Sequence, residues 1–418
     1  MQVVRTLEHI LPFDARALRT ERRWLYRQAT DRDMAVLGVG CRRLVECDDP
    51  ARALERWADL VEAGHPSMGF LSYDLREPLF GQQSRHPRSG PWPLMRWFVP
   101  EVMVLWEDGR TRFRGTDPAV IDRLIARLTA PPPVVPSGPW GPWVLSTDKT
   151  TYLGHTARLL EHIQRGDIYE VNYCVERTGH LPGRDPHAAF MRGTQRTQAA
   201  FAAFHAWDDR YAICLSPERF LWTSAGRVLC EPMKGTRRRA QDPVLDRAIA
   251  IDLANDPKER AENIMATDVV RNDLSRVAAP GSVSVPELCG IRTTGAVHQM
   301  VSRVEARLDH GRGPADAVRS AFPMASMTGA PKHRAMDLID RHEDQRRGLF
   351  SGTIGWCDGA GDLDLNVVIR TVEYDGLTGE ARLVTGSALT AACDPEHEWE
   401  ECALKACSVI DALGDAGA

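Results

Sequence analysis

The segment VVIRTVEYDGLTGEARLVTGSAL, residues Val367–Leu389, predicts two antiparallel strands joined by a turn. Its two halves, VVIRTVEYD and ARLVTGSAL, contain many β-branched residues, which fit the pleated surface of a strand. The DGLTG segment between them has the glycine and aspartate content of a hairpin turn. An antiparallel hairpin argues against a simple array of parallel βαβ units.

The chain before this hairpin alternates predicted strands with long predicted helices. Three runs between residues 211 and 233, YAICLSP, RFLWTS and RVLCEPM, predict strands separated by turn signals. Helices are predicted over residues 152–165, 257–277, 331–340 and 395–413. The pattern therefore favours an α+β or complex α/β fold.

The N-terminal part mixes the same two kinds of element. MAVLGVG (34–40) and VMVLW (102–106) predict strands, and residues 51–64 predict a helix with an apolar stripe. A break follows at PPPVVPSGPWGPW (131–143), whose six prolines and two glycines exclude a helix or a central strand. We expect an N-terminal region over 1–145 and a larger catalytic region over 146–414.

Composition limits the class of protein. The 418 residues carry a net charge of −5, so no global basic field argues for nucleic acid. Ten scattered cysteines without metal-ligand spacing suit reduced thiols better than a disulfide framework. The N-terminus has no apolar signal segment, and no apolar run is long enough to span a membrane. We therefore expect a cytoplasmic protein.

Two predicted helices begin in the same way, at NDPKERAEN and CDPEHEWEE. In each, an aspartate suits the N-cap and a proline suits the first helical position. Each helix then carries two glutamates three residues apart, which places both carboxylates on one face. These pairs are Glu259 with Glu262 and Glu398 with Glu401. They are either solvated residues that complement the helix dipole, or oxygen ligands that would suit Mg²⁺.

A single lysine stands out in EPMKGTRRRA (231–240). Lys234 follows an apolar pair and precedes a predicted tight turn and three arginines. It is either a surface residue beside a turn or an amine kept for chemistry. Partial burial and the neighbouring positive charges would each lower the pKa of Lys234 and increase its neutral fraction.

Three further residues have both an ordinary and a functional interpretation. Glu218, in SPERF, is a turn carboxylate or a catalytic acid. Arg370, in the predicted strand VVIRTVEY, faces solvent or binds an anion. Lys405 is a salt-bridge partner for Glu401 four residues earlier, or a ligand for a substrate carboxylate.

Taken together, these segments resemble the chorismate-utilising enzymes, and within them component I of the aminodeoxychorismate synthases. The matching segments are GDIYEVNYC (166–174), LSPERF (215–220), PMKGT (232–236), ERAENIMATDVVRNDLSRVA (259–278), AVHQMVS (296–302), FPMASMTGAPKHRAM (322–336), GTIGW (352–356), NVVIRTV (366–372) and DPEHEWEECALKA (394–406). GFLSYDL (69–75) fits the N-terminal part of the same family. The resemblance implies two β-sheets in a sandwich flanked by helices.

Two positions separate the reactions within this family. Where this chain has PMKGT, anthranilate synthases have a sequence that resembles Pro-Ile-Ala-Gly-Thr. The resemblance therefore makes Lys234 a feature of the aminodeoxychorismate branch. Isochorismate and salicylate synthases carry a water-activating lysine at the position of Glu170. An amine nucleophile is thus present and the water-activating base is absent. The resemblance therefore implies amination of chorismate at C4.

The same resemblance implies roles for the candidate residues. Lys234 attacks C2 of chorismate as a neutral amine, and Glu218 protonates the leaving C4 hydroxyl. Mg²⁺ would be held by Glu262 and Glu401, supported by Glu259 and Glu398. Substrate would be bound by Arg370, Lys405, Thr328, Thr236 and the backbone near Gly386. A separate glutaminase would supply ammonia, and a separate lyase would release p-aminobenzoate.

Two alternatives remain open in the sequence. The product could instead be anthranilate or 2-amino-2-deoxyisochorismate, although direct amination at C2 does not need an amine occupying that carbon. The chain could also bind chorismate without turnover, because Gln299 stands where the family often has histidine and cannot transfer a proton.

Overall fold

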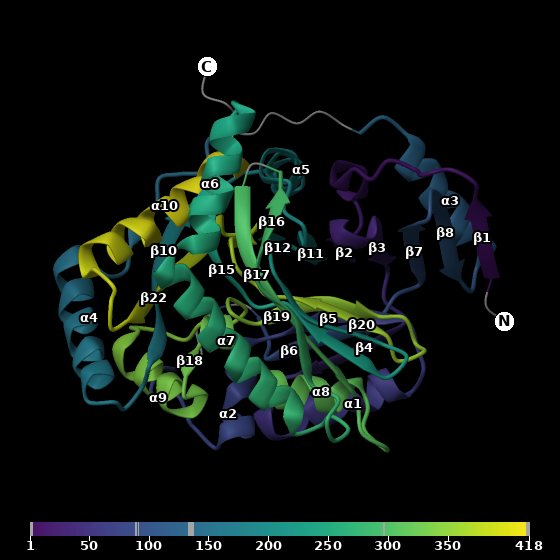
Figure 1. Ribbon diagram of the computed structural model, residues 1–418. Coiled ribbons are helices and arrows are strands. Elements are labelled where there is room, and N and C mark those ends of the chain that lie inside the picture. Colours follow the sequence, from purple (N-terminus) through teal and green to yellow (C-terminus); the bar gives the residue numbers. More distant parts are fainter. Residues whose placement is uncertain (1–2, 88–89, 91, 133–137, 296, 415–418) are drawn as a thin grey trace.

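A computed structural model describes residues 3–87, 90, 92–132, 138–295 and 297–414. These residues form two large antiparallel β-sheets with helices packed around them (Figure 1). The sandwich of two sheets and the α+β class predicted from the sequence are confirmed. Within the described part of the chain, no helix is long and apolar enough to cross a membrane.

Sheet A contains strands from both halves of the chain. In spatial order its strands are β1 (Val3–Leu7), β8 (Arg110–Gly115), β7 (Val102–Glu107), β3 (Met34–Val39), β2 (Arg23–Ala29), β11 (Ala203–Trp207), β12 (Arg210–Cys214), β21 (Thr371–Asp375), β22 (Glu380–Thr390), β10 (Glu170–His180) and β18 (Gly329–Ala330), with β9 (Val144–Leu145) beside β10. The pairing of β2 with β11 joins the N-terminal strands to the C-terminal ones.

Sheet B is also shared. Its order is β15 (Met233–Arg238), β17 (Val297–Arg307), β14 (Arg227–Cys230), β13 (Arg219–Ser224), β20 (Leu363–Asn366), β19 (Thr353–Cys357), β5 (Ser67–Leu71), β6 (Met95–Val99) and β4 (Arg43–Cys47), with β16 (Ser284–Thr294) beside β17. Here β5 pairs with β19. The expected division into regions 1–145 and 146–414 stays a prediction, and residues 133–137 of the proline-rich connector lie outside the described residues.

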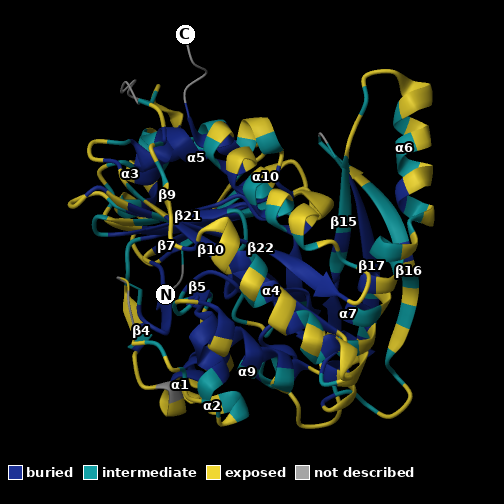
Figure 2. Cartoon of the chain, turned by 90° about the vertical axis from the view of Figure 1, so that its left-hand side faces the viewer, coloured by how far each residue is buried: buried dark blue, intermediate teal, exposed yellow. Residues whose placement is uncertain are grey.

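The helices cover the outer faces and one end of the sandwich (Figures 1 and 2). They are α1 (Pro50–Glu62), α2 (Arg76–Phe80), α3 (Pro118–Thr129), α4 (Lys149–Gln164), α5 (Pro186–Thr197), α6 (Pro243–Asn255), α7 (Pro257–Ser275), α8 (Pro314–Ala321), α9 (Lys332–His342) and α10 (Pro395–Leu413), with short 3-10 turns η1 (Ala15–Leu18), η2 (Thr30–Arg32), η3 (Tyr73–Leu75) and η4 (Ala325–Met327). An Asp-Pro pair begins α1, α3, α5, α6, α7 and α10, and each aspartate accepts a backbone N–H of the first turn.

Alternating side chains along the strands build separate apolar layers. In β2, Trp24 and Tyr26 pack into the layer beneath α3, α5 and α10, whereas Leu25 between them packs into the layer between the sheets. The inner layer also contains Phe70 of β5 and Phe98 of β6, so it joins sheet A to sheet B. The period of two in a strand thus buries both faces of sheet A.

The predicted C-terminal hairpin is confirmed. Strands β21 and β22 pair in antiparallel register, with Val372 opposite Leu383, and Asp375 caps the turn by accepting from two backbone N–H groups. The four predicted C-terminal helices correspond to α4, α7, α9 and α10, and the N-terminal one to α1. The ten cysteines are free, as the sequence predicted, while the cytoplasmic location stays a prediction.

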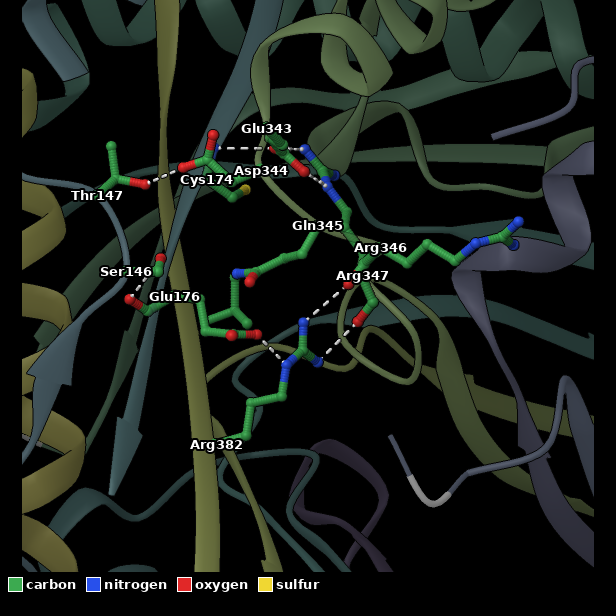
Figure 3. A pocket seen from close by; sticks show the side chains of 11 residues that line it. Ser146, Thr147, Cys174, Glu176, Glu343, Asp344, Gln345, Arg346, Arg347 and Arg382 are labelled. Carbon is green, nitrogen blue, oxygen red and sulfur yellow. Dashed lines mark hydrogen bonds and ion pairs between the residues drawn. The ribbon is translucent and has the colours of Figure 1, made fainter. Parts of the chain in front are cut away.

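A polar cluster fastens the hairpin to the neighbouring loop (Figure 3). Arg382 of β22 pairs with Glu176 of β10, and its Nη1 donates to the Arg347 carbonyl at 2.9 Å. Arg347 in turn pairs with Glu343 at 2.6 Å. The cavity among these groups holds only about 10 Å³, roughly one water. The polar cluster therefore holds β10 and β22 in place beside the larger cavity described next.

Candidate active site

A cavity of about 600 Å³ lies between the two sheets at the end where β15 of sheet B faces β22 of sheet A. Helices α7 and α10 form the rest of its wall, and both views place them beside these strands (Figures 1 and 2). The candidate residues that line it are Lys234, Glu218, Thr236, Arg370, Gly386, Lys405, Glu259, Glu262, Glu398 and Glu401. The fold therefore brings together ten positions that are spread between Glu218 and Lys405 in the sequence.

Lys234 is buried within β15 and not beside a tight turn. Gly235 follows it with φ of 74°, and the register of β15 against β17 shifts at this point, which marks a β-bulge. The bulge directs the Lys234 side chain toward sheet A, where its ammonium forms an ion pair with the Glu170 carboxylate of β10. Lys234 is 9% exposed and Glu170 is 2% exposed, so the pair is almost dry.

The predicted lowering of the Lys234 pKa is wrong. Burial alone would lower it, but the carboxylates of Glu170, Glu262 and Glu218 outweigh burial and raise the pKa above its ordinary value. The neighbouring arginines do not oppose this effect because two of them have carboxylate partners of their own. Arg237 pairs with Asp256 at 2.8 Å, and Arg239 pairs with Asp246 at 2.8 Å.

Glu218 differs from Lys234 because its environment favours the neutral form of the side chain. It follows β12 in the connection to β13 and is 5% exposed. Burial raises the pKa of Glu218 to about 7, while a hydrogen bond from Ser326 and the charge of Lys234 partly oppose the rise. The Ser326 hydroxyl donates to a carboxylate oxygen at 2.7 Å and fixes its position. A carboxyl group with this pKa can hold a proton near neutral pH and donate it.

The four glutamates of the two matched helices face one another across the cavity. In this structure a lysine lies among them, because Lys258 Nζ is 2.7 Å from Glu398 Oε1 and 3.8 Å from Glu262 Oε1. Burial raises the pKa of Glu262 to about 7, and its buried Oε1 accepts no hydrogen bond from the residues that the structure describes. The interpretation as a merely solvated, dipole-complementing face therefore does not describe Glu262.

The chemistry of these carboxylates suits a hard divalent cation. The donor set is made only of carboxylate oxygens, which Mg²⁺ prefers, and the orphaned Oε1 of Glu262 would gain a partner. Across the described residues, however, no three His, Cys, Asp or Glu side chains already converge as a metal site. Such a cation would thus be held by few carboxylates and would keep positions for water and for a substrate carboxylate.

Arg370 and Lys405 reach the cavity by different routes. Arg370 is not in a strand as predicted, since β21 begins one residue later and Arg370 adopts φ of 51°. Lys405 is both the helical salt-bridge partner of Glu401, at 2.6 Å, and a donor to the Gly386 carbonyl at 2.8 Å. A Cβ at Gly386 would lie 2.3 Å from the Cys174 sulfur, so β10 and β22 can approach here only with glycine.

Thr328 lies outside the cavity lining. It is fully buried, and its hydroxyl donates to the Met324 carbonyl at 3.0 Å within the turn around η4. Its own carbonyl accepts from the backbone N–H of Asn172 at 2.9 Å. Thr328 therefore supports the strand that carries Glu170, and its expected contact with substrate stays a prediction.

Sequence reasoning missed three functional contacts. Glu170 was recognised only as the place where a lysine is absent, and nothing in GDIYEVN signals its pairing with Lys234. Ser326 has no local signal either, since its partner Glu218 is 108 residues away. Lys258 had a weak signal, because it lies four residues before Glu262 on one helix face.

The chorismate binding enzyme family matches residues 19–411, and the chain belongs to this family. Among solved structures, anthranilate synthase component I from Streptococcus pneumoniae has a TM-score of 0.81 at 21% identity and covers 90% of this chain and 92% of its own. The menaquinone-specific isochorismate synthase from Escherichia coli has a TM-score of 0.78 at 18% identity, with coverage of 99% and 95%. These structures share the fold.

Curated relatives include two aminodeoxychorismate synthases. One from Streptomyces griseus is 40% identical over 300 residues, which are 71% of this chain and 41% of the relative. Aminodeoxychorismate synthase component 1 from Salmonella typhimurium is 41% identical over 239 residues, 57% of this chain and 52% of the relative. The chain spans about half the length of these relatives. Anthranilate synthase component 1 from Thermus thermophilus is 30% identical over 412 residues, with coverage of 91% and 88%.

Proposed function

We propose that the chain is a chorismate-utilising synthase that converts chorismate and ammonia to 4-amino-4-deoxychorismate through a covalent intermediate on Lys234. The observation that carries this proposal is the buried ion pair of Lys234 with Glu170, in which Lys234 lines the same cavity as Glu218, whose pKa burial raises to about 7. One group is an amine and the other an acid, which are the two functions that displacement of the C4 hydroxyl requires. The names of the aminodeoxychorismate synthase relatives support the same reaction.

The first half of the reaction starts with a proton transfer. Glu170 accepts a proton from the Lys234 ammonium across their hydrogen bond, which leaves a neutral amine. The amine lone pair forms a bond to C2, the ring double bonds shift, and the bond from C4 to its hydroxyl breaks. Glu218 gives its proton to that hydroxyl, which leaves as water. The result is a secondary ammonium that links Lys234 to C2, while Glu170 holds the first lysine proton.

The second half reverses the shift. The lone pair of ammonia forms a bond to C4, the double bonds return, and the bond from C2 to the Lys234 nitrogen breaks with its electrons returning to the lysine. The new ammonium group at C4 gives its extra proton to Glu218, and Lys234 takes back its proton from Glu170. A separate glutamine amidotransferase supplies the ammonia, in keeping with the "component 1" in the name of the Salmonella relative. A separate lyase converts the product to p-aminobenzoate.

The carboxylate groups of chorismate need positive partners in this cavity. Arg370 and Lys405 supply cationic donors, with the Thr236 hydroxyl and the backbone of Gly386 in the same wall. Glu262 and Glu401 would hold Mg²⁺, with Glu259 and Glu398 beside them. Bound there, the ion would supply a positive charge against the ring carboxylate.

Product analysis tests this function. The purified chain is incubated with chorismate, MgCl₂ and an ammonium salt, and an aminodeoxychorismate lyase is added to one half of the sample. We expect p-aminobenzoate only in the half with lyase. Unconsumed chorismate would contradict the proposal and point to a binding subunit. Fluorescent anthranilate in both halves would contradict it in favour of the activity named for the Thermus relative.

A further inference from the structure

The turn at η4 is held by its backbone, and this turn carries the side chain that binds Glu218. The Ser326 hydroxyl donates to the Glu218 carboxyl at 2.7 Å. The Ser326 carbonyl accepts from Asn172 Nδ2 at 2.9 Å, and the Thr328 carbonyl accepts from the backbone N–H of Asn172 at 2.9 Å. Asn172 therefore holds both ends of the segment that presents the Ser326 hydroxyl to Glu218.

Arg347 holds the middle of the same turn. This arginine is buried, and its Nη1 donates to the Met327 carbonyl at 2.6 Å while its Nη2 donates to the Asn172 carbonyl at 2.8 Å. Its Nε and Nη2 bind the two carboxylate oxygens of Glu343 at 2.9 and 2.6 Å (Figure 3). A bidentate pair of this kind fixes the plane of the guanidinium. Arg347 thus joins the turn to β10 in one geometry.

The same contacts support the strand that carries Glu170. Strand β22 pairs along one edge of β10, and the other edge pairs with β18 near its start and with β9 further along. Between β18 and β9, the Cys174 N–H donates to Glu343 Oε1 at 3.0 Å, and the Asn172 carbonyl accepts from Arg347. The ion pair of Arg347 with Glu343 therefore supplies hydrogen bonds that a neighbouring strand would supply.

We propose that Asn172 is a positioning residue that sets the place of the proton donor Glu218 relative to the proton acceptor Glu170, with Arg347 as its anchor. This inference rests on the proposed function, in which Glu218 gives a proton and Glu170 takes one. Asn172 reaches Glu218 through Ser326, and it lies two residues from Glu170 on the same strand. A shift of Asn172 would therefore displace both groups, and proton transfer needs each within hydrogen-bond reach.

The charges that face Glu218 do not replace the contact with Ser326. Lys234 faces it from β15 and Arg370 from the segment before β21, and both favour the carboxylate. Arg219, the next residue, is already bound by three carboxylates. The hydrogen bond from Ser326 opposes the effect of burial more strongly than either facing charge. Loss of this bond should therefore raise the pKa of Glu218 further, because the donor stabilises the carboxylate.

Titration of Glu218 in the unliganded protein tests whether Asn172 acts on it. The carbonyl stretching band of the protonated carboxyl is followed by infrared spectroscopy from about pH 5 to about pH 9, as a difference from Glu218→Gln. Asn172→Leu removes the donor at similar volume and adds no charge. We expect its Glu218 midpoint to rise by about one pH unit, as in Ser326→Ala, because both variants lose the hydrogen bond to the carboxylate.

A double variant separates an effect through Ser326 from any other effect. Asn172→Leu combined with Ser326→Ala should have the midpoint of Ser326→Ala alone. Tyr374→Phe is the matched control, because it removes a buried donor to the Leu181 carbonyl outside the cavity, and it should keep the parental midpoint. Asn172→Ala repeats the measurement if Asn172→Leu does not fold. A parental midpoint in the Asn172 variant, or shifts that add in the double variant, would overturn the inference.

Adduct formation tests the effect on Glu170. The adduct on Lys234 is measured without ammonia at a pH below the Glu218 midpoint, where the acid is protonated in every variant. We expect Asn172→Leu to form it about 10²-fold more slowly than the parent, the cost of a misplacement of about 1 Å. A parental rate would overturn the role of Asn172 at Glu170. A parent chain that never consumes chorismate would instead contradict the proposed function, and the infrared midpoints would still decide whether Asn172 positions Glu218.

Discussion

At the scale of single residues, the site keeps a proton on Glu218 that a glutamate in water would lose near neutral pH, while Lys234 stays charged, as it is in water. The amine of Lys234 is charged and held by Glu170, while the carboxyl of Glu218 keeps its proton near neutral pH. Each state has a local cause, since the lysine has carboxylate neighbours and the glutamate is buried. In the proposed mechanism, the chemistry begins when Glu170 accepts the lysine proton.

Replacing Glu170 tests that first transfer. Glu170→Gln keeps the size of the side chain but cannot accept a proton. We expect the rate of adduct formation on Lys234, measured by quenched mass spectrometry without ammonia, to fall by about 10²–10⁴-fold. The control is Glu176→Gln on the same strand, whose partner is Arg382 outside the cavity. Equal rates in the parent and in Glu170→Gln would refute the role of Glu170.

The pKa of Glu218 predicts a pH dependence. Burial raises the pKa of Glu218 from the ordinary 4.5 to about 7. The carboxyl group therefore carries its proton below about pH 7 and loses it above that pH. Adduct formation should therefore decrease as pH rises through about 7. The stabilisation linked to this proton follows the same sign: it is complete below about 4.5 and is lost as pH rises through about 7. A rate of adduct formation that rises steadily from about pH 6 to about pH 9 would contradict this assignment.

At the scale of elements, two helix starts and one bulge arrange the site. Asp256 and Asp394 cap α7 and α10, and the first two turns of these helices carry the four glutamates to the cavity. The bulge at Gly235 lets β15 turn the Lys234 side chain toward sheet A. The side chain of Lys258, a residue of α7, reaches Glu398 of α10 and neutralises part of the negative charge of the two helices.

Removing Lys258 should strengthen cation binding. Its ammonium repels a divalent cation placed among the same carboxylates, so Lys258→Gln is expected to tighten Mg²⁺ binding by about tenfold, or about 1.4 kcal/mol. Isothermal titration with MgCl₂ and no chorismate measures this. Lys149→Gln is the control, because Lys149 pairs with the exposed Glu396 of α10. Weaker binding in Lys258→Gln than in the control would show that the carboxylates do not form the cation site.

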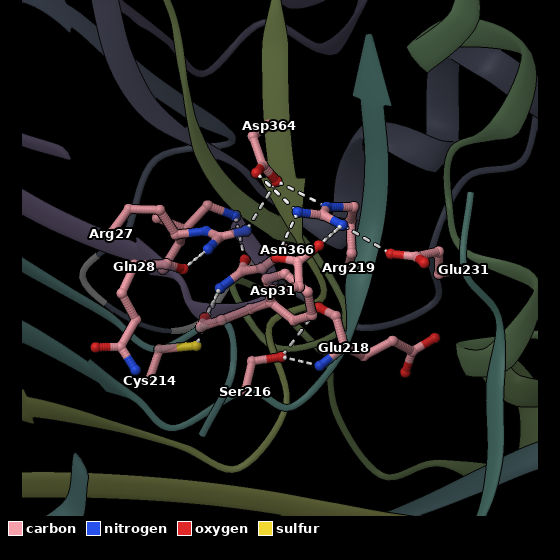
Figure 4. Close-up of polar contacts among 12 residues, drawn as sticks. Arg27, Gln28, Asp31, Cys214, Ser216, Glu218, Arg219, Glu231, Asp364 and Asn366 are labelled. Carbon is pink, nitrogen blue, oxygen red and sulfur yellow. Dashed lines mark hydrogen bonds and ion pairs between the residues drawn. The ribbon is translucent and has the colours of Figure 1, made fainter. Parts of the chain in front are cut away.

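At the scale of the whole molecule, the two sheets are joined by a buried ion network as well as by apolar side chains. Arg27 of β2 in sheet A binds Asp364 of β20 in sheet B at 3.0 Å. Arg219 of β13 binds the same carboxylate, and Asp364 is completely buried (Figure 4). The network includes Arg219, the residue next to Glu218. The same ion pairs therefore hold the two sheets together and hold Glu218 in position.

Loss of Asp364 should therefore destabilise the whole molecule. Asp364→Ala leaves two buried guanidinium groups without this partner, and we expect the free energy of unfolding to fall by about 3–5 kcal/mol. Asp268→Ala removes an exposed ion pair with Arg271 and should cost at most about 1 kcal/mol. Urea denaturation of both variants measures the difference. Comparable small losses would contradict a central role for the network.

Local signals predicted the parts of this molecule that depend on nearby residues. The hairpin around Asp375 and the starts of α7 and α10 follow from turn and capping chemistry. The same Asp-Pro signal also precedes α3, α5 and α6, which were not predicted. The position of Arg370 outside the strand depends on its φ, which its apolar neighbours do not reveal.

Long-range contacts account for what the sequence did not predict. The sign of the Lys234 pKa shift depends on Glu170, which lies 64 residues away on the other sheet. Thr328 was expected at the substrate, but its hydroxyl satisfies a carbonyl of its own turn. The position of Gln299 in a second cavity requires the pairing of β16 and β17 and the approach of η2.

The most direct test of the central claim is intact-mass spectrometry of the chain with chorismate and MgCl₂ but without ammonia. We predict a covalent adduct equal to chorismate less one water, located on Lys234 by peptide mapping and absent from Lys234→Ala. Subsequent addition of an ammonium salt should remove the adduct and release the aminated product. Turnover by the parent chain with no adduct at Lys234, or undiminished turnover by Lys234→Ala, would contradict the account.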